Sequence, residues 1–502
     1  MTSPTRRTIA LVSGPLFFLL FILFFDLDPS NRQVTYMGAI ALWMAIWWIT
    51  ETVPLAVTAL LPVILFPAMG VMNGRDVSSI YFNHIIFLFI GGFLVALAME
   101  RWNLHKRIAL RIMMIFGVHP AGILLGFMTA TWFLSMWISN TATTMMMVPI
   151  GLAVITRLEK LLGKNQVQKY SIGLFLGLAY SASIGGIATP VGTPPNLSFT
   201  RIFSIIFPEA PEISFASWFV FAFPLSLIFL VLLWLILTKF FCGGINRSRL
   251  DATVFRKQLK ELGRISFEER TVLFDFLLLI FLWLFRSDIS VGSFVIPGWS
   301  RLFPDPAFLN DGTVAIAMAT ILFLVPSRKH PGSRIMNWET ASKLPWNIVL
   351  LFGGGFALAS GFTKSGLSDW LGDQLSGIGS LHPVLIVGMV CLFVTFLTEL
   401  TSNTATSEML LPILAALAIS IKVNPLLLMI PATLSCSCAF MLPVATPPNA
   451  IIFGTQRVRV SEMAKVGLLI NMVGVILITF FAFTFLRGIL GIDFSTLPLW
   501  AQ

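Results

Sequence analysis

The sequence is poor in charge, cysteine and histidine. Charged residues make up 11% of its 502 residues, against roughly 25% in soluble domains. Hydrophobic residues make up 57%. A soluble fold could not bury that much apolar surface, so lipid must be the solvent for most of the chain. The composition therefore predicts an integral membrane protein.

The scarcity of cysteine and histidine argues against an enzyme. The five histidines all lie near the ends of predicted spans, which argues against a proton relay. The chain has no HExxH motif, and no Gly-x-Ser-x-Gly motif lies beside a credible base. An anion channel would need a continuous polar or charged pore lining, which these spans do not offer. The cysteines lie in or beside apolar spans with no metal-site spacing and are expected to be buried small hydrophobes: Cys242, Cys391, Cys436 and Cys438.

The basic residues are clustered. Six runs hold about 25 of the 33 Lys and Arg residues, and the positive-inside rule makes such runs cytoplasmic. The net charge of +10 therefore reports membrane topology and gives no reason to expect a nucleic-acid partner. The basic runs are residues 6–7, 101–111, 157–169, 239–270, 328–343 and 457–465.

Apolar runs of spanning length follow one another along the chain, with no low-complexity linker and no soluble domain. The first run follows Arg6 and Arg7 without a clear cleavage site, so it is expected to be a retained span and not a signal peptide. Residues 247–270 have the spacing of an amphipathic helix on the cytoplasmic surface. The uninterrupted runs are 9–25, 35–51, 53–71, 84–111, 216–241, 271–286, 311–326, 346–363 and 466–487. The interrupted runs are 120–156, 168–207, 383–421 and 424–456.

Three polar or glycine- and proline-rich segments occur twice in the same order. Trp-Ile-Ser-Asn-Thr-Ala-Thr-Thr at 137–144 returns as Leu-Thr-Ser-Asn-Thr-Ala-Thr-Ser at 400–407, and a proline follows each copy at the same spacing. Thr-Pro-Val-Gly-Thr-Pro-Pro-Asn at 189–196 returns as Leu-Pro-Val-Ala-Thr-Pro-Pro-Asn at 442–449. Gly-Gly-Phe at 91–93 returns at 354–356. Helix breakers are tolerated in a membrane only where the backbone lines a protein cavity, and duplicated broken segments indicate a transporter's midplane site.

The charge pattern predicts that the two copies are inverted. Both flanks of 120–156 are basic, so this segment is expected to enter and leave the cytoplasmic face as a re-entrant hairpin with Ser-Asn-Thr at its tip. Five spans separate this tip from the second one, and an odd number reverses direction. The second hairpin, 383–421, is therefore expected to open to the outside. Two antiparallel copies would bring both tips and both Pro-Pro breaks to one central site.

The repeated residues are suited to ion binding. Ser, Asn and Thr offer hydroxyl, carbonyl and amide groups that do not titrate near neutral pH. The prolines force each broken span to unwind, which frees the carbonyls of Gly192 and Ala445 and places the hydroxyls of Thr193 and Thr446 beside them. Free carbonyls suit a cation, whereas free N–H groups at a helix start suit an anion.

The missing basic residues indicate what accompanies the solute. No Lys or Arg occurs in 112–156, 170–200, 365–421 or 423–456. An anion bound there would lack side-chain counter-charge, and burying a bare carboxylate costs several kcal/mol or more. Hard monovalent cations held by oxygen ligands would offset that cost. The two carbonyl clusters therefore predict at least two such cations, and we expect them to be Na⁺.

Structural interpretations remain open for several residues. A single Ser-Asn-Thr in an apolar helix is usually hydrogen-bonding glue between helices, but two copies with matched breaks favour function. The glycines at 91–92 and 353–355 are expected to be close-packing positions. Glu399 is either a structural hydrogen-bonding group or a functional intramembrane acid. Glu408 stands where the other repeat has Met145, and no role is assigned to it.

The doubled Ser-Asn-Thr tips and Thr-Pro-Pro-Asn breaks resemble the divalent anion:sodium symporter family, the Indy-type dicarboxylate transporters. The resemblance covers about residues 35–490. It implies an all-α polytopic homodimer in the lipid membrane, with about eleven spans and two re-entrant hairpins per protomer, in which transport elements move against a scaffold like an elevator. It implies a first sodium site of Ser135, Ser139, Asn140 and Gly192, and a second of Thr398, Ser402, Asn403 and Ala445. It implies substrate contacts from Ser139, Asn140, Thr141, Thr193, Ser402, Asn403, Thr404 and Thr446.

The resemblance implies sodium-coupled symport of a small dianion of the C4-dicarboxylate class, such as succinate, malate or fumarate. Exchange of dicarboxylates or 2-oxoglutarate, and sodium-coupled transport of sulfate or citrate, stay open as alternatives. The expected location is a bacterial inner membrane, with the N-terminus cytoplasmic and the C-terminus outside. Scaffold spans are expected at 1–118 and 271–381, the transport halves at 119–245 and 382–502, and a cytoplasmic amphipathic helix at 246–270.

Overall fold

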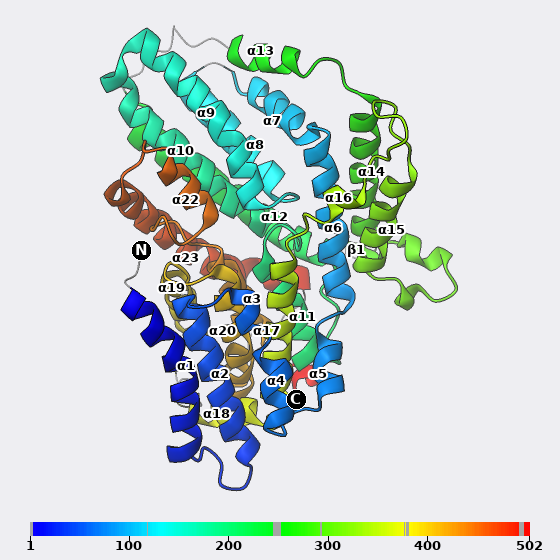
Figure 1. Cartoon of the computed structure of the whole chain (residues 1–502), viewed down its shortest axis with the longest axis vertical. Coiled ribbons are helices and arrows are strands. Elements are labelled where there is room, and N and C mark those ends of the chain that lie inside the picture. The colour runs from blue at the N-terminus through cyan, green and yellow to red at the C-terminus, as the bar shows by residue number, and fades with distance from the viewer. Residues whose placement is uncertain are drawn as a thin grey trace.

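Helices form most of the chain in the computed structural model, which describes residues 4–117, 119–243, 253–291, 294–375, 377, 381–490 and 496–502 (Figure 1). Among these residues, seven helical stretches are long and apolar enough to cross a membrane. This agrees with the predicted polytopic helical membrane protein. The seven stretches are Arg7–Phe24, Gly74–Arg101, Lys164–Ile187, Phe215–Phe241, Trp346–Ser365, Asn403–Ser420 and Val460–Leu486. Shorter apolar helical stretches lie at Leu55–Ala68, Pro120–Ser135, Asp311–Leu324, Pro383–Thr398 and Leu426–Cys436.

The first helices pack together with α17 and α18 around one apolar cluster. On α2, buried Met37, Ile40, Met44 and Trp48 recur every three or four residues, which places them on one helix face. The elements of this first part are α1 (Pro4–Phe24), α2 (Arg32–Thr50), α3 (Leu55–Thr58), α4 (Leu61–Ala68), α5 (Gly74–Ile80), α6 (His84–Arg101) and α7 (Leu104–Ile115).

Two runs that the sequence suggested were single spans are divided in the structure. The run 53–71 forms α3 and α4, with Pro62 in the first turn of α4. The run 84–111 divides at Asn103, which adopts a left-handed conformation with φ 58° between α6 and α7. The basic α7 is held by Arg107, which forms a buried ion pair with Glu269 on α14. Hydropathy alone did not reveal either division.

The middle of the chain contains the first hairpin, the first broken span and a group of shorter elements. Its helices are α8 (Pro120–Ser135), α9 (Asn140–Leu162), α10 (Lys164–Ile187), α11 (Pro194–Ile206), α12 (Phe215–Phe241), α13 (Thr253–Glu261), α14 (Phe267–Leu284) and α15 (Asp311–Leu324). The antiparallel pair β1 (Ile289–Val291) and β2 (Phe294–Ile296) is an addition to the all-α expectation, and short 3₁₀ turns follow at Trp299–Leu302 and Pro306–Phe308. Helix α13 falls within the predicted amphipathic segment, of which 246–252 lies outside the described residues.

The last part repeats the hairpin and the broken span. Its helices are α16 (Trp338–Ala341), α17 (Trp346–Ser365), α18 (Leu367–Leu375), α19 (Pro383–Thr398), α20 (Asn403–Ser420), α21 (Leu426–Cys436), α22 (Pro447–Gly454) and α23 (Val460–Leu490), with a 3₁₀ turn at Leu499–Ala501. Helices α7, α8, α9 and α13 gather at one end of the long axis, whereas α1, α2 and α18 lie toward the other (Figure 1).

Burial separates central helices from peripheral ones. Every residue in the apolar window of α10 is buried inside the protein, compared with 39% for α23 and 11% for α1. The exposed side chains of the peripheral helices are large and apolar, for example Phe24, Val231 and Ile476. Apolar side chains at these positions suit a lipid environment, since water would make their exposure unfavourable. The apolar part of α10 therefore lies in the interior of the fold, although the helix begins at exposed residues.

Candidate functional site

Each Ser-Asn-Thr segment lies where one helix of a pair ends and the next begins. Ser139 is the N-cap of α9, and its hydroxyl accepts a hydrogen bond from the Ala142 N–H at 3.2 Å. Ser402 is the N-cap of α20, but its hydroxyl makes no capping hydrogen bond. The side chains of Asn140 and Asn403 are partly exposed at these tips, although most of the surrounding residues are buried. Both tips therefore offer polar groups that another molecule can reach.

The same side-chain contact forms in both hairpins. The Ser135 hydroxyl donates to Asn140 Oδ1, and the Thr398 hydroxyl donates to Asn403 Oδ1 at 2.7 Å. Thr398 Oγ1 also lies 2.9 Å from the Cys436 carbonyl oxygen, at the end of α21. A hydroxyl has one hydrogen and cannot donate fully to two acceptors. The second cluster therefore has more oxygen lone pairs than donors, which is the chemistry of a cation site.

The first cluster also includes the break between α10 and α11. A Cβ atom added to Gly186 would lie 2.9 Å from Asn140 Oδ1 and 3.1 Å from the Gly192 carbonyl oxygen. Gly186 therefore borders the small volume that these two oxygens share, and only a residue without a side chain leaves it free. The structure thus brings together Ser135, Asn140 and Gly192, three of the residues predicted for one sodium ion.

The second predicted set is brought together less completely. Thr398, Asn403 and the end of α21 are in contact, whereas Ala445 lies in the break and donates its N–H to the Leu442 carbonyl at 3.2 Å. Among the described residues, no hydrogen bond joins Ala445 to Asn403. Thr193 and Thr446 are buried N-caps of α11 and α22, and Thr446 accepts from the Asn449 N–H. Thr141 is partly exposed and Thr404 is buried at the two tips.

An asparagine holds each break in shape. The side-chain amide of Asn196 donates to the carbonyls of Gly186 at 3.1 Å and Thr189 at 2.8 Å. The amide of Asn449 donates to the carbonyls of Ala439 and Leu442, both at 3.0 Å. All three positions of the second set lie 253 residues after their counterparts. The repeat seen in the sequence is therefore also a repeat of hydrogen bonds. Both asparagines belong to the repeated motif, but the motif alone does not predict this role for them.

Glu399 also links a hairpin to a break. Its carboxylate accepts from the N–H groups of Met441 at 2.7 Å and Leu442 at 3.0 Å, and from the Asn471 amide at 2.8 Å. The equivalent position of the first hairpin, Met136, accepts through its backbone carbonyl from the Thr189 hydroxyl at 2.6 Å. The structure therefore favours the structural interpretation of Glu399, which fixes the second break to the second hairpin.

The two repeats pack crosswise. Helix α11 of the first break packs on α20 of the second hairpin, and α22 of the second break packs on α9 of the first hairpin. This reciprocal pairing brings elements of both repeats to the centre of the fold. It is the arrangement that two inverted copies with a common site would produce.

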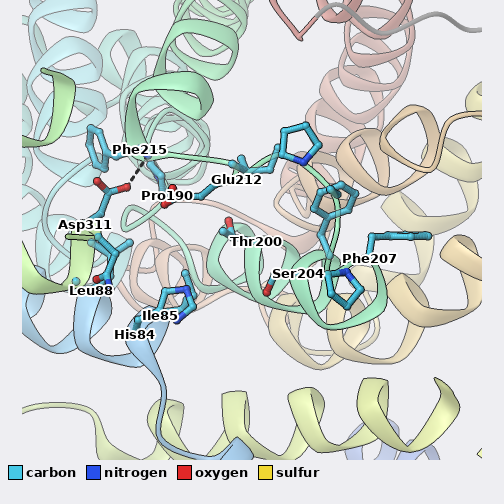
Figure 2. A pocket seen from close by; sticks show the side chains of 17 residues that line it. His84, Ile85, Leu88, Pro190, Thr200, Ser204, Phe207, Glu212, Phe215 and Asp311 are labelled. Carbon is cyan, nitrogen blue, oxygen red and sulfur yellow. Dashed lines mark hydrogen bonds between the residues drawn. The ribbon is translucent and has the colours of Figure 1, made fainter. Parts of the chain in front are cut away.

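A cavity of about 190 Å³ lies beside the first break (Figure 2). Pro190 of the break borders it, and Thr200 and Ser204 face it from α11. Two carboxylates on its wall, Glu212 and Asp311, are both paired with Arg286, at 2.7 Å and 2.6 Å. None of the predicted site residues lines this cavity. Its two acids share one arginine, and neither Lys nor Arg lines it in the described part of the chain, so an anionic solute would meet net negative charge there and we do not assign the solute to it.

The sequence motifs do not identify three residues that the structure sets apart: Gly186 beside the first cluster, Ser198 against Glu408, and Asp275 on α14. Gly186 and Ser198 lie outside the quoted motifs, and no local pattern distinguishes them. Asp275, in the middle of α14, is buried and neither of its carboxylate oxygens has a hydrogen-bond partner among the described residues. An acid within an apolar run is a detectable signal, but the prediction for 271–286 did not consider it.

Comparison with known proteins gives a consistent result. Residues 8–491 match the family described as the sodium:sulfate symporter transmembrane region. The sodium-dependent dicarboxylate transporter SdcS of Staphylococcus saprophyticus is 44% identical over 500 residues, which cover 98% of this chain and 94% of the relative. The SdcS protein of a Staphylococcus aureus strain is 43% identical over 511 residues, covering 99% and 94%.

Solved structures of more distant transporters share the fold. MtrF of Neisseria gonorrhoeae, described among antimetabolite efflux pumps, aligns with a TM-score of 0.59 at 13% identity, covering 90% of this chain and 94% of MtrF. The YdaH transporter of Alcanivorax borkumensis aligns with a TM-score of 0.57 at 12% identity, covering 80% and 84%. At such low identity these similarities concern the fold alone.

Proposed function

We propose that this chain, which belongs to the sodium:sulfate symporter family of transmembrane proteins, is a secondary active transporter. It would carry C4-dicarboxylates into the cell together with sodium ions. It is not proposed to be an enzyme. The SdcS relatives, which match over nearly the whole chain, carry the name of sodium-dependent dicarboxylate transporters. The observation that carries the proposal is the pair of oxygen clusters at the tips, each at an equivalent position of the repeat.

Sodium would bind first at these clusters. The first site is proposed to use Ser135, Ser139, Asn140 and the Gly192 carbonyl. The second is proposed to use Thr398, Ser402, Asn403 and the Ala445 carbonyl. In each site a hydroxyl lies against an amide oxygen at a helix end. The proposed sodium ligands are therefore oxygen atoms that carry no formal charge. At least two cations are therefore proposed for each transport cycle.

The dicarboxylate would bind after the cations. The N–H groups at the starts of α9 and α20 and the hydroxyls at the two tips can donate hydrogen bonds to carboxylates. The proposed contacts come from Ser139, Asn140, Thr141 and Thr193 in one repeat and from Ser402, Asn403, Thr404 and Thr446 in the other. Without basic side chains in these segments, the bound sodium ions would supply the positive charge that stabilises the dianion.

We further propose that α8–α9 and α19–α20 are re-entrant hairpins of an inverted repeat, in a fold of about eleven spans. The described ion pairs support this topology, because each joins two residues that the charge pattern assigns to the same face of the membrane. Arg107 with Glu269 and Arg457 with Glu159 join segments assigned to the cytoplasm. The pairs assigned to the outer face are Arg286 with Glu212 and Asp311, Arg301 with Asp288, and Lys364 with Asp76.

The transport elements are proposed to be 119–245 and 382–502, and the scaffold 1–118 and 271–381, in an elevator-type homodimer of a bacterial inner membrane. The link from Arg286 on the scaffold to Glu212 in the transport half would then have to open when the halves move. The large apolar cluster supports a close contact between the two, since it joins α6, α14 and α15 with the hairpins.

Uptake of labelled succinate into proteoliposomes tests the function. An inward sodium gradient should drive accumulation above equilibrium, because inward movement of sodium supplies the free energy. Uptake that needs internal dicarboxylate but no sodium would instead establish exchange. Competition with unlabelled malate, fumarate, citrate and sulfate would define the substrate, and strong competition by sulfate alone would contradict a dicarboxylate carrier.

A further inference from the structure

Glu408 is an acid in the middle of the protein whose role the proposed mechanism does not explain. It lies on α20, five residues after Asn403, and its side chain is 0% exposed. The equivalent position of the first repeat, Met145 on α9, is 61% exposed. The two repeats therefore differ sharply here, and the second buries a carboxyl group where the first exposes a thioether.

The two oxygens of the carboxyl group have very different surroundings. Oε1 accepts a 2.5 Å hydrogen bond from the hydroxyl of Ser198 on α11. Oε2 has no hydrogen-bond partner among the described residues. It lies directly against Gly355 on α17, since a Cβ atom added to that glycine would be 1.5 Å from Oε2. Glu408 thus lies at the contact between the proposed transport elements α11 and α20 and the proposed scaffold helix α17.

No positive charge compensates this carboxyl group in the described part of the chain. Helices α2, α11, α17, α18, α19 and α21 pack against α20. None of their charged side chains forms an ion pair with Glu408 among the described residues, and Ser198 is its one hydrogen-bond donor there. The titratable groups on these helices are Arg32, Tyr36, Arg201, Lys364, Asp369, Asp373, Cys391 and Cys436.

Glu399, in the same hairpin, shows what a stabilised carboxylate looks like in this fold. It is also buried, but both of its oxygens accept hydrogen bonds, from Met441, Leu442 and Asn471. Three donors can hold a carboxylate in its charged form, whereas one hydroxyl leaves most of the desolvation cost of Glu408 uncompensated. Glu408 therefore needs a bound cation.

We propose that Glu408 is a proton-binding site of the transport half, and that its carboxyl holds a proton while it lies against Gly355. This inference rests on the proposed function, because the proton would neutralise Glu408 as the transport half moves past the scaffold. One O–H bond forms when the proton arrives from water, and the same bond breaks when it leaves. A proton fits better than sodium, because the Ser198 hydroxyl is the one further oxygen ligand that the described contacts place at the carboxyl group.

The test compares sodium-driven succinate uptake at about pH 7.5 and about pH 9.5 in proteoliposomes. Both carboxyls of succinate are ionised at both values, so the substrate does not change its charge. Wild-type uptake should fall at least about threefold at the higher pH as Glu408 loses its proton. Glu408→Gln, which keeps the shape and stays neutral, should remove this fall. Equal ratios of uptake at the two pH values in wild type and Glu408→Gln would overturn the proposal.

Ser198→Ala provides a second variant that keeps the acid. The hydroxyl donates to the carboxylate and so favours the charged form. Its loss should move the alkaline fall to higher pH by about one unit. An unchanged pH profile in Ser198→Ala would contradict the assigned contact, and this result can be read even if Glu408→Gln fails to fold.

Glu399→Gln is the matched control from the same hairpin. Because three donors stabilise Glu399 as a carboxylate, whatever uptake this variant retains should show the wild-type pH ratio. In the contrary outcome, Glu408→Gln keeps the wild-type ratio of uptake at the two pH values while its sodium Hill coefficient falls by about one. That result would identify Glu408 as a sodium ligand and refute the proton site. Absence of sodium-driven uptake in the wild type at pH 7.5 would instead refute the proposed function.

Discussion

At the scale of single residues, the proposed sodium sites combine amide and hydroxyl oxygens with the space left by a glycine. The amide oxygens of Asn140 and Asn403 each accept a hydrogen bond from a hydroxyl five residues earlier, across the turn of a hairpin. Gly186 leaves the space that a methyl group would otherwise take from the first cluster. Neutral oxygens and empty volume suit a small cation that has to bind and leave in each cycle.

Asn140→Ala and Asn403→Ala should each abolish sodium-driven succinate uptake while the protein still folds. Each change removes an oxygen ligand of a proposed sodium site and an amide donor to the substrate. Uptake in proteoliposomes measures the loss, and size-exclusion chromatography measures folding. Asn73→Ala is the control, because Asn73 caps the short helix α5 far along the chain from both sites, and should cost only about 1 kcal/mol of stability. Normal uptake by either site variant would refute the assignment.

Gly186→Ala should weaken sodium binding with little effect on folding. The new methyl would lie 2.9 Å from Asn140 Oδ1 and 3.1 Å from the Gly192 oxygen, where the first ion is proposed to bind. We expect the sodium concentration for half-maximal uptake to rise at least about tenfold, which corresponds to about 1.4 kcal/mol. Gly151→Ala on α9 is the control, since its methyl meets its neighbours at an ordinary 3.4 Å. Equal sodium dependence in both variants would contradict the site.

At the scale of elements, polar contacts hold the ends of broken helices. The amides of Asn196 and Asn449 cross the two breaks and donate hydrogen bonds to backbone carbonyls that have no partner within a helix.

A similar set of hydrogen bonds occurs at the start of α14. There Glu268 accepts hydrogen bonds from the Ser327 hydroxyl at 2.9 Å and from the N–H groups of Arg328 and Lys329, both at 2.8 Å. This ties α14 to the segment that follows α15.

Glu268→Gln should lower stability in a pH-dependent way. Burial acts to raise the pKa of Glu268, but the backbone N–H of Lys329 and the Ser327 hydroxyl outweigh it and lower the pKa to about 2, from an ordinary 4.5. A lowered carboxyl pKa contributes stability that is present above the unfolded value and is lost as the pH falls from about 4.5 toward 2. The variant should therefore unfold about 2 kcal/mol more easily at about pH 6.

Thermal unfolding in detergent at about pH 6 and about pH 3 measures this effect. The difference between wild type and Glu268→Gln should shrink at the lower pH, because the wild-type carboxylate loses part of its advantage. Glu462→Gln, in the partly exposed first turn of α23, should show a small difference at both pH values. A difference that stays constant between the two pH values would contradict the role given to the charge of Glu268.

At the scale of the whole molecule, helices of one repeat pack against helices of the other. Helix α11 packs on α20 and α22 packs on α9, so the second helix of each broken span lies against the hairpin of the other repeat. The charge pattern assigns the two members of each described ion pair to one membrane face, which supports the inverted topology. A site between two inverted copies can open to either side when one group of helices moves against the other.

Cysteine labelling should place the exposed turns on opposite faces. In a Cys242→Ala background, the remaining cysteines are buried. Ser30→Cys, in the exposed turn between α1 and α2, should react with a membrane-impermeant maleimide in intact cells. Lys260→Cys, exposed on α13, should react only after the membrane is permeabilised. Labelling of both positions in intact cells, or the reverse pattern, would contradict the orientation derived from the positive-inside rule.

The sequence by itself determined the membrane class, the doubled motifs and the residues at the hairpin tips. These features are local: apolar runs, unpaired backbone at Pro-Pro and helix starts at Ser-Asn-Thr depend on neighbours within a few positions. The tertiary structure decided the rest. It joined Ser198 to Glu408 across 210 positions, placed Gly186 beside Asn140 and packed α11 and α22 on the hairpins of the opposite repeats. Such contacts depend on how whole helices pack, and no spacing within one segment encodes that packing.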